Sequence, residues 1–96
     1  MSGTSISSEG MDERRRRLLF RATHCGMKEL DWLLGRFAEA NIHALNESEV
    51  TAFEQLIQVP DQQLLAWLTW AEEVPAVYDT LLFRRIREAG GIKKPG

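Results

Sequence analysis

The spacing of the apolar residues is the feature that most constrains how this chain can fold. Between Met27 and Ala38 they recur at intervals of three and four, the period that puts side chains on one face of an α-helix. Similar spacing returns after Asn46, Pro60 and Pro75, and no segment shows the strict alternation of a half-buried strand. The sequence therefore predicts an all-α fold, a small five-helix bundle in a single domain.

Residues that begin and end helices divide the chain into its elements. Asp12 and Glu13 suit the positive end of a first helix, and Gly26 is expected to stop it. The second helix is expected over about 27–41. Because glycine inside a helix costs about 1 kcal/mol relative to alanine, Gly35 predicts close packing by another helix.

The second half of the chain also contains residues that typically begin and end helices. Asn46 and Glu49 have the spacing of a capping box, which predicts a third helix through about Gln58. Pro60 and Asp61 start a fourth helix. A fifth helix is expected after Pro75, with Val77, Tyr78, Leu81, Leu82 and Ile86 on its apolar side and Gly90-Gly91 at its end. The predicted core consists of Leu30, Leu34, Phe37, Phe53, Leu56, Leu65, Leu68, Leu81 and Leu82.

Length and composition bound the domain organisation. With 96 residues, 44% of them hydrophobic and 27% charged, the chain is expected to form one globular domain. Residues 1–11 are predicted to be a disordered tail, 12–90 the helical domain and 91–96 a flexible C-terminal tail. A single cysteine excludes a disulfide framework, and no apolar run approaches the roughly 18 residues that cross a bilayer.

Charge is distributed unevenly along the chain. Residues 12–28 carry six Arg and Lys against two acids, residues 29–79 one against ten, and residues 80–96 five against one. The basic run Arg14–Arg17 is either a solvated helix face or a docking surface for an acidic partner. It also leaves open a small helical nucleic-acid-binding or antitoxin-like regulator, which the acidic middle of the chain opposes.

The residue types that perform chemistry do not form a recognisable catalytic pattern. Cys25 follows His24 with no paired acid at a spacing typical of a nucleophile. His24, Cys25 and His43 are too dispersed to predict a metal site, and the chain has no Gly-rich phosphate loop. We therefore expect no enzyme, no catalytic residue, no metal and no tightly bound cofactor of its own.

The three tryptophans favour a binding module. Trp67 lies on the inward side of its predicted helix, whereas Trp32 and Trp70 fall off the apolar stripes. Either of these two is expected to meet a partner or to cap the edge of a thin core. A self-associating helical adaptor is a third possibility, and we expect a monomer or a weak dimer.

Residues 16–39 resemble the bacterial SdhE family and its mitochondrial relatives, the flavinylation factors of succinate dehydrogenase. The family signature is Arg-Gly-x-x-Glu followed by Leu-Asp or a similar pair. Here the corresponding turn reads Cys25-Gly26-Met27-Lys28-Glu29-Leu30-Asp31, and residues 61–68 (DQQLLAWL) resemble a further family stretch. The resemblance covers roughly residues 14–88.

The resemblance implies a helical assembly factor in the bacterial cytoplasm. Such factors bind the flavoprotein subunit of succinate dehydrogenase, and in some bacteria of fumarate reductase, and promote covalent attachment of FAD to a histidine of that partner. The FAD belongs to the partner. No nucleic acid and no membrane insertion are implied.

The resemblance also implies a partner-binding site at this turn. Gly26 and Glu29 match the signature, and Asp31 follows on the same helix end. Cys25 stands where the family has arginine, so the charge and the donors of that side chain are missing. We hypothesise that Arg21, one turn earlier, partly replaces it, with Lys28 as another candidate. Arg21→Ala is then expected to weaken partner binding more than substitution of an exposed arginine, for which Arg87 is chosen.

Overall fold

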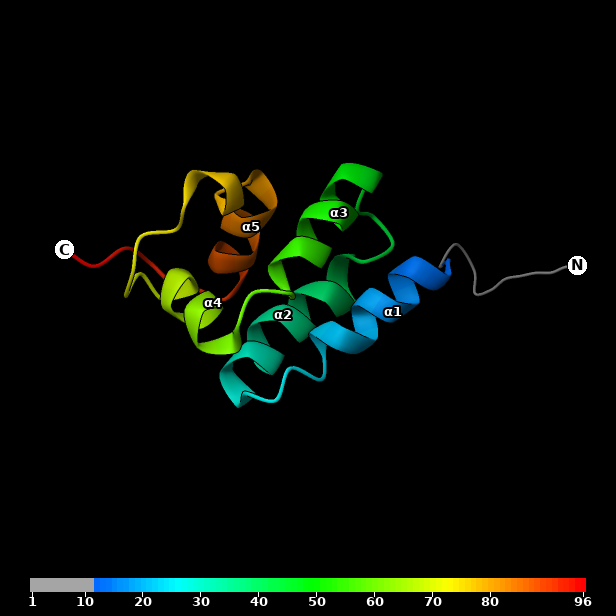
Figure 1. Cartoon of the computed structure of the whole chain (residues 1–96), viewed down its shortest axis with the longest axis horizontal. Helices are drawn as coiled ribbons and strands as arrows, with labels where there is room; N and C mark the ends of the chain where they lie inside the picture. Colours follow the sequence, from blue (N-terminus) through cyan, green and yellow to red (C-terminus); the bar gives the residue numbers. More distant parts are fainter. Residues whose placement is uncertain (1–11) are drawn as a thin grey trace, which may run out of the picture.

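Five α-helices and one short 3-10 helix build the fold in the computed structural model, which describes residues 12–96 (Figure 1). The elements are α1 (Glu13–Ala22), α2 (Lys28–Asn41), α3 (Glu47–Leu56), α4 (Asp61–Leu68), η1 (Ala76–Tyr78) and α5 (Leu81–Ala89). No strand occurs in this part of the chain, so the all-α, five-helix prediction is confirmed. The predicted tail over residues 1–11 lies outside the described residues.

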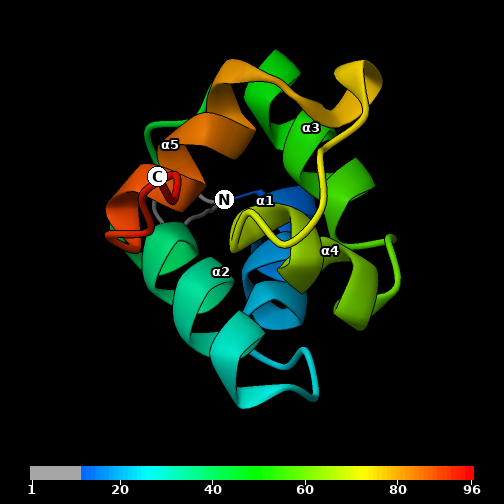
Figure 2. The ribbon, with the colours of Figure 1, turned by 90° about the vertical axis from the view of Figure 1, so that its left-hand side faces the viewer.

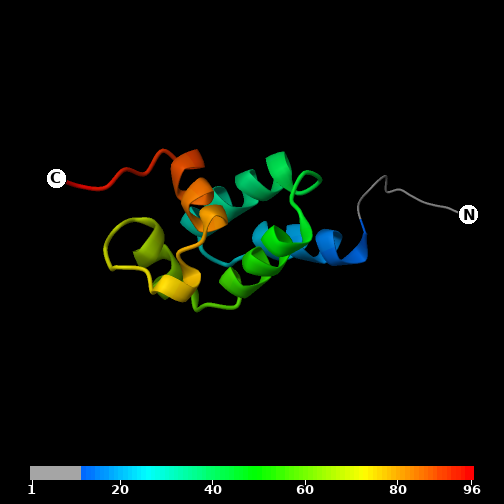
Figure 3. The ribbon, with the colours of Figure 1, turned by 90° about the horizontal axis from the view of Figure 1, so that it is seen from above.

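Helix α2 is the central element. It packs against α1, α4 and α5, while α3 contacts α1 and α5. Figure 1 shows α1, α2 and α3 grouped on one side and α4, η1 and α5 on the other, and Figure 2 shows α5 next to α2. The C-terminal residues leave α5 as an extended segment (Figure 3). The loop between α1 and α2 lies at the lower edge of Figure 1, next to the start of α4.

Seven of the nine predicted core residues are buried. Leu65 is half-buried. The prediction that Leu81 belongs to the core is wrong, because its side chain is 70% exposed. The hydroxyl of Thr80 accepts a hydrogen bond from the backbone N–H of Phe83 and so caps α5 directly before Leu81. With this start, Leu82, Phe83 and Ile86 face the core and Leu81 faces solvent.

The predicted extent of the fifth helix is wrong, because the Thr80 cap divides this segment into two separate elements. Val77 and Tyr78 belong to η1, and only Leu81 onward belongs to α5. Tyr78 packs its ring 5.1 Å from that of Trp67, whereas Val77 is exposed. Trp67 itself is buried, as predicted.

The first helix also ends earlier than predicted, at Ala22 and not at Gly26. The hydroxyl of Thr23 donates to the carbonyl oxygens of Leu19 and Phe20, so side-chain bonds satisfy the last turn before the glycine is reached. This helix end packs on α2 at Gly35, where an added Cβ would lie 3.2 Å from Cγ2 of Thr23. The close approach predicted from Gly35 is confirmed.

The predicted capping box at the start of α3 is also confirmed. The side chain of Asn46 accepts from the backbone N–H of Glu49, and the Glu49 carboxylate accepts from the backbone N–H of Asn46, both at 2.8 Å. Two orphan N–H groups of the helix start are thereby satisfied. The boundaries of α2 and α4 agree with the sequence to within one residue at the start of each helix.

Two of the four arginines in the basic run, Arg14 and Arg15, form hydrogen bonds that hold the helices together. Arg14 donates to both carboxylate oxygens of Glu54 at 2.8 and 3.0 Å and pairs with Glu47 at 2.6 Å, which ties α1 to α3. Arg15 donates to the carbonyl oxygen of Ile42 at 2.7 Å. Arg16 is exposed, and its side chain has no hydrogen bond or ion pair within residues 12–96.

The tie between Arg14 and Glu54 predicts a pH-dependent contribution to stability. The hydrogen bond from Arg14 lowers the pKa of Glu54 despite an opposing effect of burial. The stabilisation is therefore present above the ordinary pKa of a glutamate and is lost as the pH falls through the lowered value in the folded protein. We expect Glu54→Gln to lower the melting temperature at pH 7, and this effect to diminish as the pH falls below the ordinary pKa of a glutamate.

Thermal unfolding followed by circular dichroism across this pH range checks the expectation. Glu39→Gln on the exposed side of α2 is the matched control, since Glu39 has no ion pair within the described residues. A gap between Glu54→Gln and the original chain that stays constant with pH would contradict it.

Candidate functional site

The six predicted partner-binding residues lie together at the end of α1, in the following loop and in the first turn of α2. We call this region the motif surface; its residues are Arg21, Cys25, Gly26, Lys28, Glu29 and Asp31. Arg21, Gly26, Lys28 and Glu29 are exposed, while Cys25 and Asp31 are half-buried. The side chains of Arg21, Lys28 and Glu29 form no ion pair or hydrogen bond within residues 12–96. They are therefore free to contact another molecule.

Gly26 gives the loop its shape. Its φ angle of +90° is one that side-chain-bearing L-residues rarely adopt. The heavy atom nearest to an added Cβ would be Oδ2 of Asp61, at an ordinary contact distance of 3.8 Å. The requirement for glycine in the isolated chain is therefore conformational, and the space over Gly26 is open.

Asp31 stabilises the loop between α1 and α2 through a hydrogen bond within the chain. Its Oδ1 accepts a hydrogen bond from the backbone N–H of Cys25, six residues earlier. The sequence places Asp31 in the partner-binding set; the structure shows in addition that it holds the loop backbone in position. The carboxylate of Glu29, two positions earlier, has no such internal bond among residues 12–96 and sits where the dipole of α2 favours an anion.

The thiol of Cys25 is held in its neutral form. Its Sγ lies 3.4 Å from the carbonyl oxygen of Ala22 and 3.5 Å from that of Arg21. Burial, followed by the nearby carboxylates of Asp31 and Asp61, raises the pKa of Cys25 to about 11, and the Arg21 charge opposes this shift. Cys25 is therefore a protonated, weakly nucleophilic thiol near neutral pH.

This protonation predicts slow thiol chemistry. Because the thiolate is the reactive form, a pKa near 11 in place of the ordinary value of 9.0 reduces the thiolate fraction about 100-fold at pH 7. We expect Cys25 in the folded chain to react with iodoacetamide about 100-fold more slowly than in the chain unfolded in urea, measured by mass spectrometry.

Folding also changes how the rate of Cys25 alkylation depends on pH. The pKa of Cys25 is higher folded than unfolded, so its contribution to stability is complete below pH 9 and is lost as the pH rises toward 11. The folded-to-unfolded rate difference should shrink over the same interval. Equal alkylation rates for the folded and unfolded chain at pH 7 would contradict the assignment.

Two exposed aromatic side chains flank the motif surface. Phe20 is 61% exposed and stacks on the ring of His24 with a centroid distance of 4.0 Å. Trp32 is 51% exposed, and the guanidinium of Arg36 lies 5.0 Å from its ring centroid. A hollow of about 550 Å³ joins Trp32 to Glu29 over an apolar floor that includes Leu33. Exposed aromatics next to open charges are typical of a protein-binding surface.

Asp61 is a neighbour of the site that the sequence did not assign to it. Its carboxylate lies next to Gly26 and contributes to the raised pKa of Cys25. Its sequence signals are its place after Pro60 at a helix start and its position in the family-like stretch 61–68, and neither says which loop the helix approaches. The packing of α4 on α2 brings Asp61 to the motif surface.

The described residues hold no cluster suited to a metal ion. No three or more His, Cys, Asp or Glu side chains within residues 12–96 converge on a common point. Within the same residues no helix has the length and apolar character needed to cross a bilayer. The features of this surface are those of recognition: open charges, an exposed glycine backbone and exposed aromatics.

Comparison with known proteins identifies the family. The family model Sdh5, described as "Flavinator of succinate dehydrogenase", matches residues 16–89, which include the whole motif surface. The chain belongs to the Sdh5 family. The match covers α1 from Arg16 onward and every later helix through the last residue of α5.

Relatives in this family come from bacteria and mitochondria. An FAD assembly factor SdhE from Acetobacter pasteurianus is 36% identical over 95 residues, covering 99% of this chain and 87% of the relative. The mitochondrial succinate dehydrogenase assembly factor 2 of Dictyostelium discoideum is 35% identical over 77 residues, or 80% of this chain. The chain spans about half the length of the mitochondrial relatives, 55% in Dictyostelium and 51% in a Drosophila ananassae protein. No solved structure gave a significant match.

Proposed function

We propose that this protein is an FAD assembly factor that binds the flavoprotein subunit of succinate dehydrogenase and promotes covalent attachment of FAD to it. The observation that carries the proposal is the Sdh5 family match across residues 16–89, with 36% identity to an FAD assembly factor over nearly the whole chain. We place the protein in the bacterial cytoplasm, as a monomer or weak dimer, with fumarate reductase as a further possible client.

In this proposal the chain supplies recognition and orientation. As the resemblance to flavinylation factors implies, the partner holds the FAD and supplies the histidine that becomes linked to it, and residues 12–96 contain no Gly-rich phosphate loop. Holding the reacting groups of the partner in one geometry lowers the barrier without any group of this chain entering the reaction. The protein is therefore an assembly chaperone and not an enzyme.

Each exposed residue of the motif surface has a role in docking. The carboxylate of Glu29 binds a cationic side chain of the flavoprotein through charge-assisted hydrogen bonds. The bare backbone at Gly26 lets a partner main chain come close. Arg21 and Lys28 supply positive charge on either side of Cys25, in place of the family arginine.

The central test is co-expression of the flavoprotein subunit with and without this protein. The covalently bound flavin is measured as fluorescence that stays on the denatured gel band. We expect the band to brighten with the original chain and Glu29→Gln to reduce the gain about tenfold or more, since a hydrogen bond to a charged group contributes about 1.5–3 kcal/mol. Glu39→Gln on the same helix is the matched control.

Two further variants test the departure at Cys25. Cys25→Arg is expected to match or exceed the original chain, and Arg21→Ala to bind the flavoprotein more weakly. Arg87 is not a suitable control because it is buried, contrary to the prediction; exposed Arg16 takes its place. Unchanged flavinylation with both the original chain and Cys25→Arg would contradict the proposed client.

A further inference from the structure

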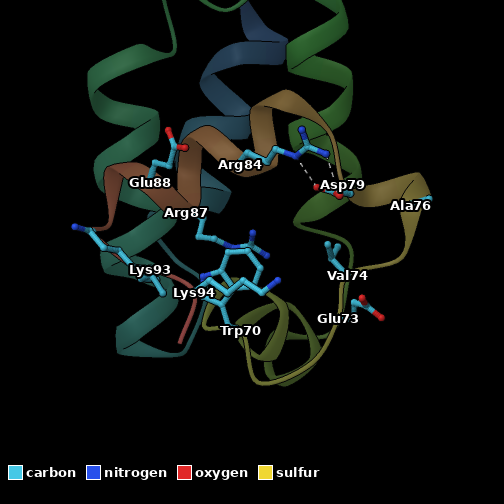
Figure 4. Close-up of a pocket in the computed structure, with 12 residues that line it drawn as sticks. Trp70, Glu73, Val74, Ala76, Asp79, Arg84, Arg87, Glu88, Lys93 and Lys94 are labelled. Carbon is cyan, nitrogen blue, oxygen red and sulfur yellow. Dashed lines mark hydrogen bonds and ion pairs between the residues drawn. The ribbon is translucent and has the colours of Figure 1, made fainter. Parts of the chain in front are cut away.

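A second hollow lies beside α5 and the C-terminal segment, and Ile92 lines both this hollow and the one that joins Trp32 to Glu29. It has a volume of about 830 Å³ and lies between the connection after α4, helix α5 and the C-terminal segment (Figure 4). We call it the Arg87 cleft; its lining includes Trp70, Val74, Asp79, Arg84, Arg87 and Lys94. The volume is in the range of ligand sites in proteins.

Arg87 is the unusual residue of this cleft, because its charge is buried. The residue is only 6% exposed, and burial lowers the pKa of its guanidinium. Its Nη2 donates to the carbonyl oxygen of Trp67 at 2.9 Å. Its Nε has neither a hydrogen-bond partner nor solvent contact within the described residues. A buried charged donor without an acceptor is costly, so this guanidinium is only partly satisfied.

Trp70 adds a second donor and a strained backbone. The guanidinium carbon of Arg87 lies 3.5 Å from its ring centroid, and Figure 4 shows the two groups stacked in the cleft. Its indole Nε1 is also buried without a partner among residues 12–96. With a φ of 67°, Trp70 occupies the left-handed region, which is unfavourable for a bulky side chain. The chain therefore places two donor-only groups side by side without an acceptor.

The remaining charges of the lining neutralise Arg87 only in part, since Asp79 attracts its charge but forms no hydrogen bond with it. Arg84 is paired with Asp79 through two hydrogen bonds of 2.9 and 3.1 Å. The carboxylates of Glu73 and Glu88 belong to the lining but point away from the guanidinium in Figure 4. The ammonium group of Lys94 lies 5.7 Å from the Trp70 ring centroid, so a second cation is close to the same indole.

We propose that the Arg87 cleft binds a carboxylate carried on an apolar body, with the guanidinium of Arg87 as its donor and the Trp70 ring beside it. A carboxylate only accepts hydrogen bonds, and its two oxygens fit the fork of a guanidinium. Val74, Ile92 and the Trp70 ring provide apolar wall for the rest of the ligand.

Two sources share this chemistry: a small organic acid and an acidic side chain within a peptide. The test uses matched probes for each, phenylacetate against phenylacetamide, and acetyl-Leu-Glu-Leu-amide against its Gln counterpart. The readout is the indole N–H signals of the three tryptophans in a proton–nitrogen correlation spectrum, with Trp70 assigned through Trp70→Phe. We expect only the carboxylate probes to shift the Trp70 signal saturably. Trp32, outside the cleft lining, serves as the internal reference.

Variants assign the effect to the named residues. Arg87→Lys keeps the charge but loses the planar fork, and is expected to weaken probe binding about tenfold. A Lys93→Ala/Lys94→Ala double variant leaves the core intact and is expected to weaken binding about threefold, with a smaller dependence on salt. Arg16→Ala on α1 is the matched control and should leave binding unchanged.

The outcomes separate the possibilities. Binding of phenylacetate supports a small acid, and binding of the Glu peptide alone supports a peptide ligand. Equal shifts from phenylacetamide would overturn the carboxylate assignment, and no saturable shift from any probe would overturn the site. If Arg87→Lys fails to fold, the double lysine variant decides, and unchanged affinity and salt dependence in it would overturn the proposed charge recognition.

Discussion

Replacing Gly26 with alanine is expected to reduce flavinylation of the partner about tenfold or more, while destabilising the fold only modestly. The φ of +90° imposes about 1–2 kcal/mol of strain on a residue with a Cβ. The added carbon meets nothing closer than 3.8 Å, so no other part of the chain must move. The larger effect comes from the partner, whose backbone can no longer approach the bare loop. Tenfold corresponds to about 1.4 kcal/mol of lost binding.

The chain provides its own control for this experiment. Gly91, in the C-terminal segment, has a φ of +73° and no heavy atom within 4 Å of an added Cβ. Gly91→Ala therefore introduces similar strain without adding a carbon to the motif surface. Urea denaturation should give similar losses of stability for the two variants, and the gel assay should separate them. Equal losses of flavinylation would show that strain, and not docking, explains the Gly26 result.

Truncating Phe53 to alanine is expected to have the largest effect on stability. Its side chain is 0% exposed, and its ring centroid lies 6.0 Å from that of Phe37 across the contact between α3 and α2. Such a cavity costs about 3–5 kcal/mol. A domain of this size has about 5–15 kcal/mol of total stability, so the variant should lose a large part of it.

Urea denaturation followed by circular dichroism measures this loss. Phe20→Ala is the matched control, because the same side chain is removed from a mostly exposed position. Its free energy of unfolding should change by no more than about 0.5 kcal/mol. A Phe53→Ala midpoint close to that of Phe20→Ala would contradict the position of Phe53 in the core.

Patterns confined to one stretch of sequence predicted their part of the fold well. The capping box at Asn46 and the periodic face of α2 each involve residues within a few turns of one another. The helix ends that were predicted at the wrong residues have a different cause. Thr23 ends α1 before Gly26, and Thr80 restarts the chain after η1, through side-chain bonds that compete with helix continuation.

The motif surface and the Arg87 cleft also differ in how far the sequence alone could predict them. The motif surface could be predicted because its residues are close in sequence and resemble a family signature. Its contact with Asp61 and the stacking of Arg87 on Trp70 could not, because they join residues 35 and 17 positions apart through tertiary packing. The left-handed backbone of Trp70 contradicts local preference, which favours glycine or asparagine there.

The bond from Asp31 to the backbone of Cys25 affects how inherited variation at this turn should be interpreted. A change at Asp31 alters loop geometry and surface charge at once, so a loss-of-function allele there does not by itself identify a contact with the partner. Asparagine keeps an oxygen that can accept the Cys25 N–H while removing the charge, whereas alanine removes both. The Asp31→Asn allele therefore reports on charge recognition, and the difference between it and Asp31→Ala reports on loop shape.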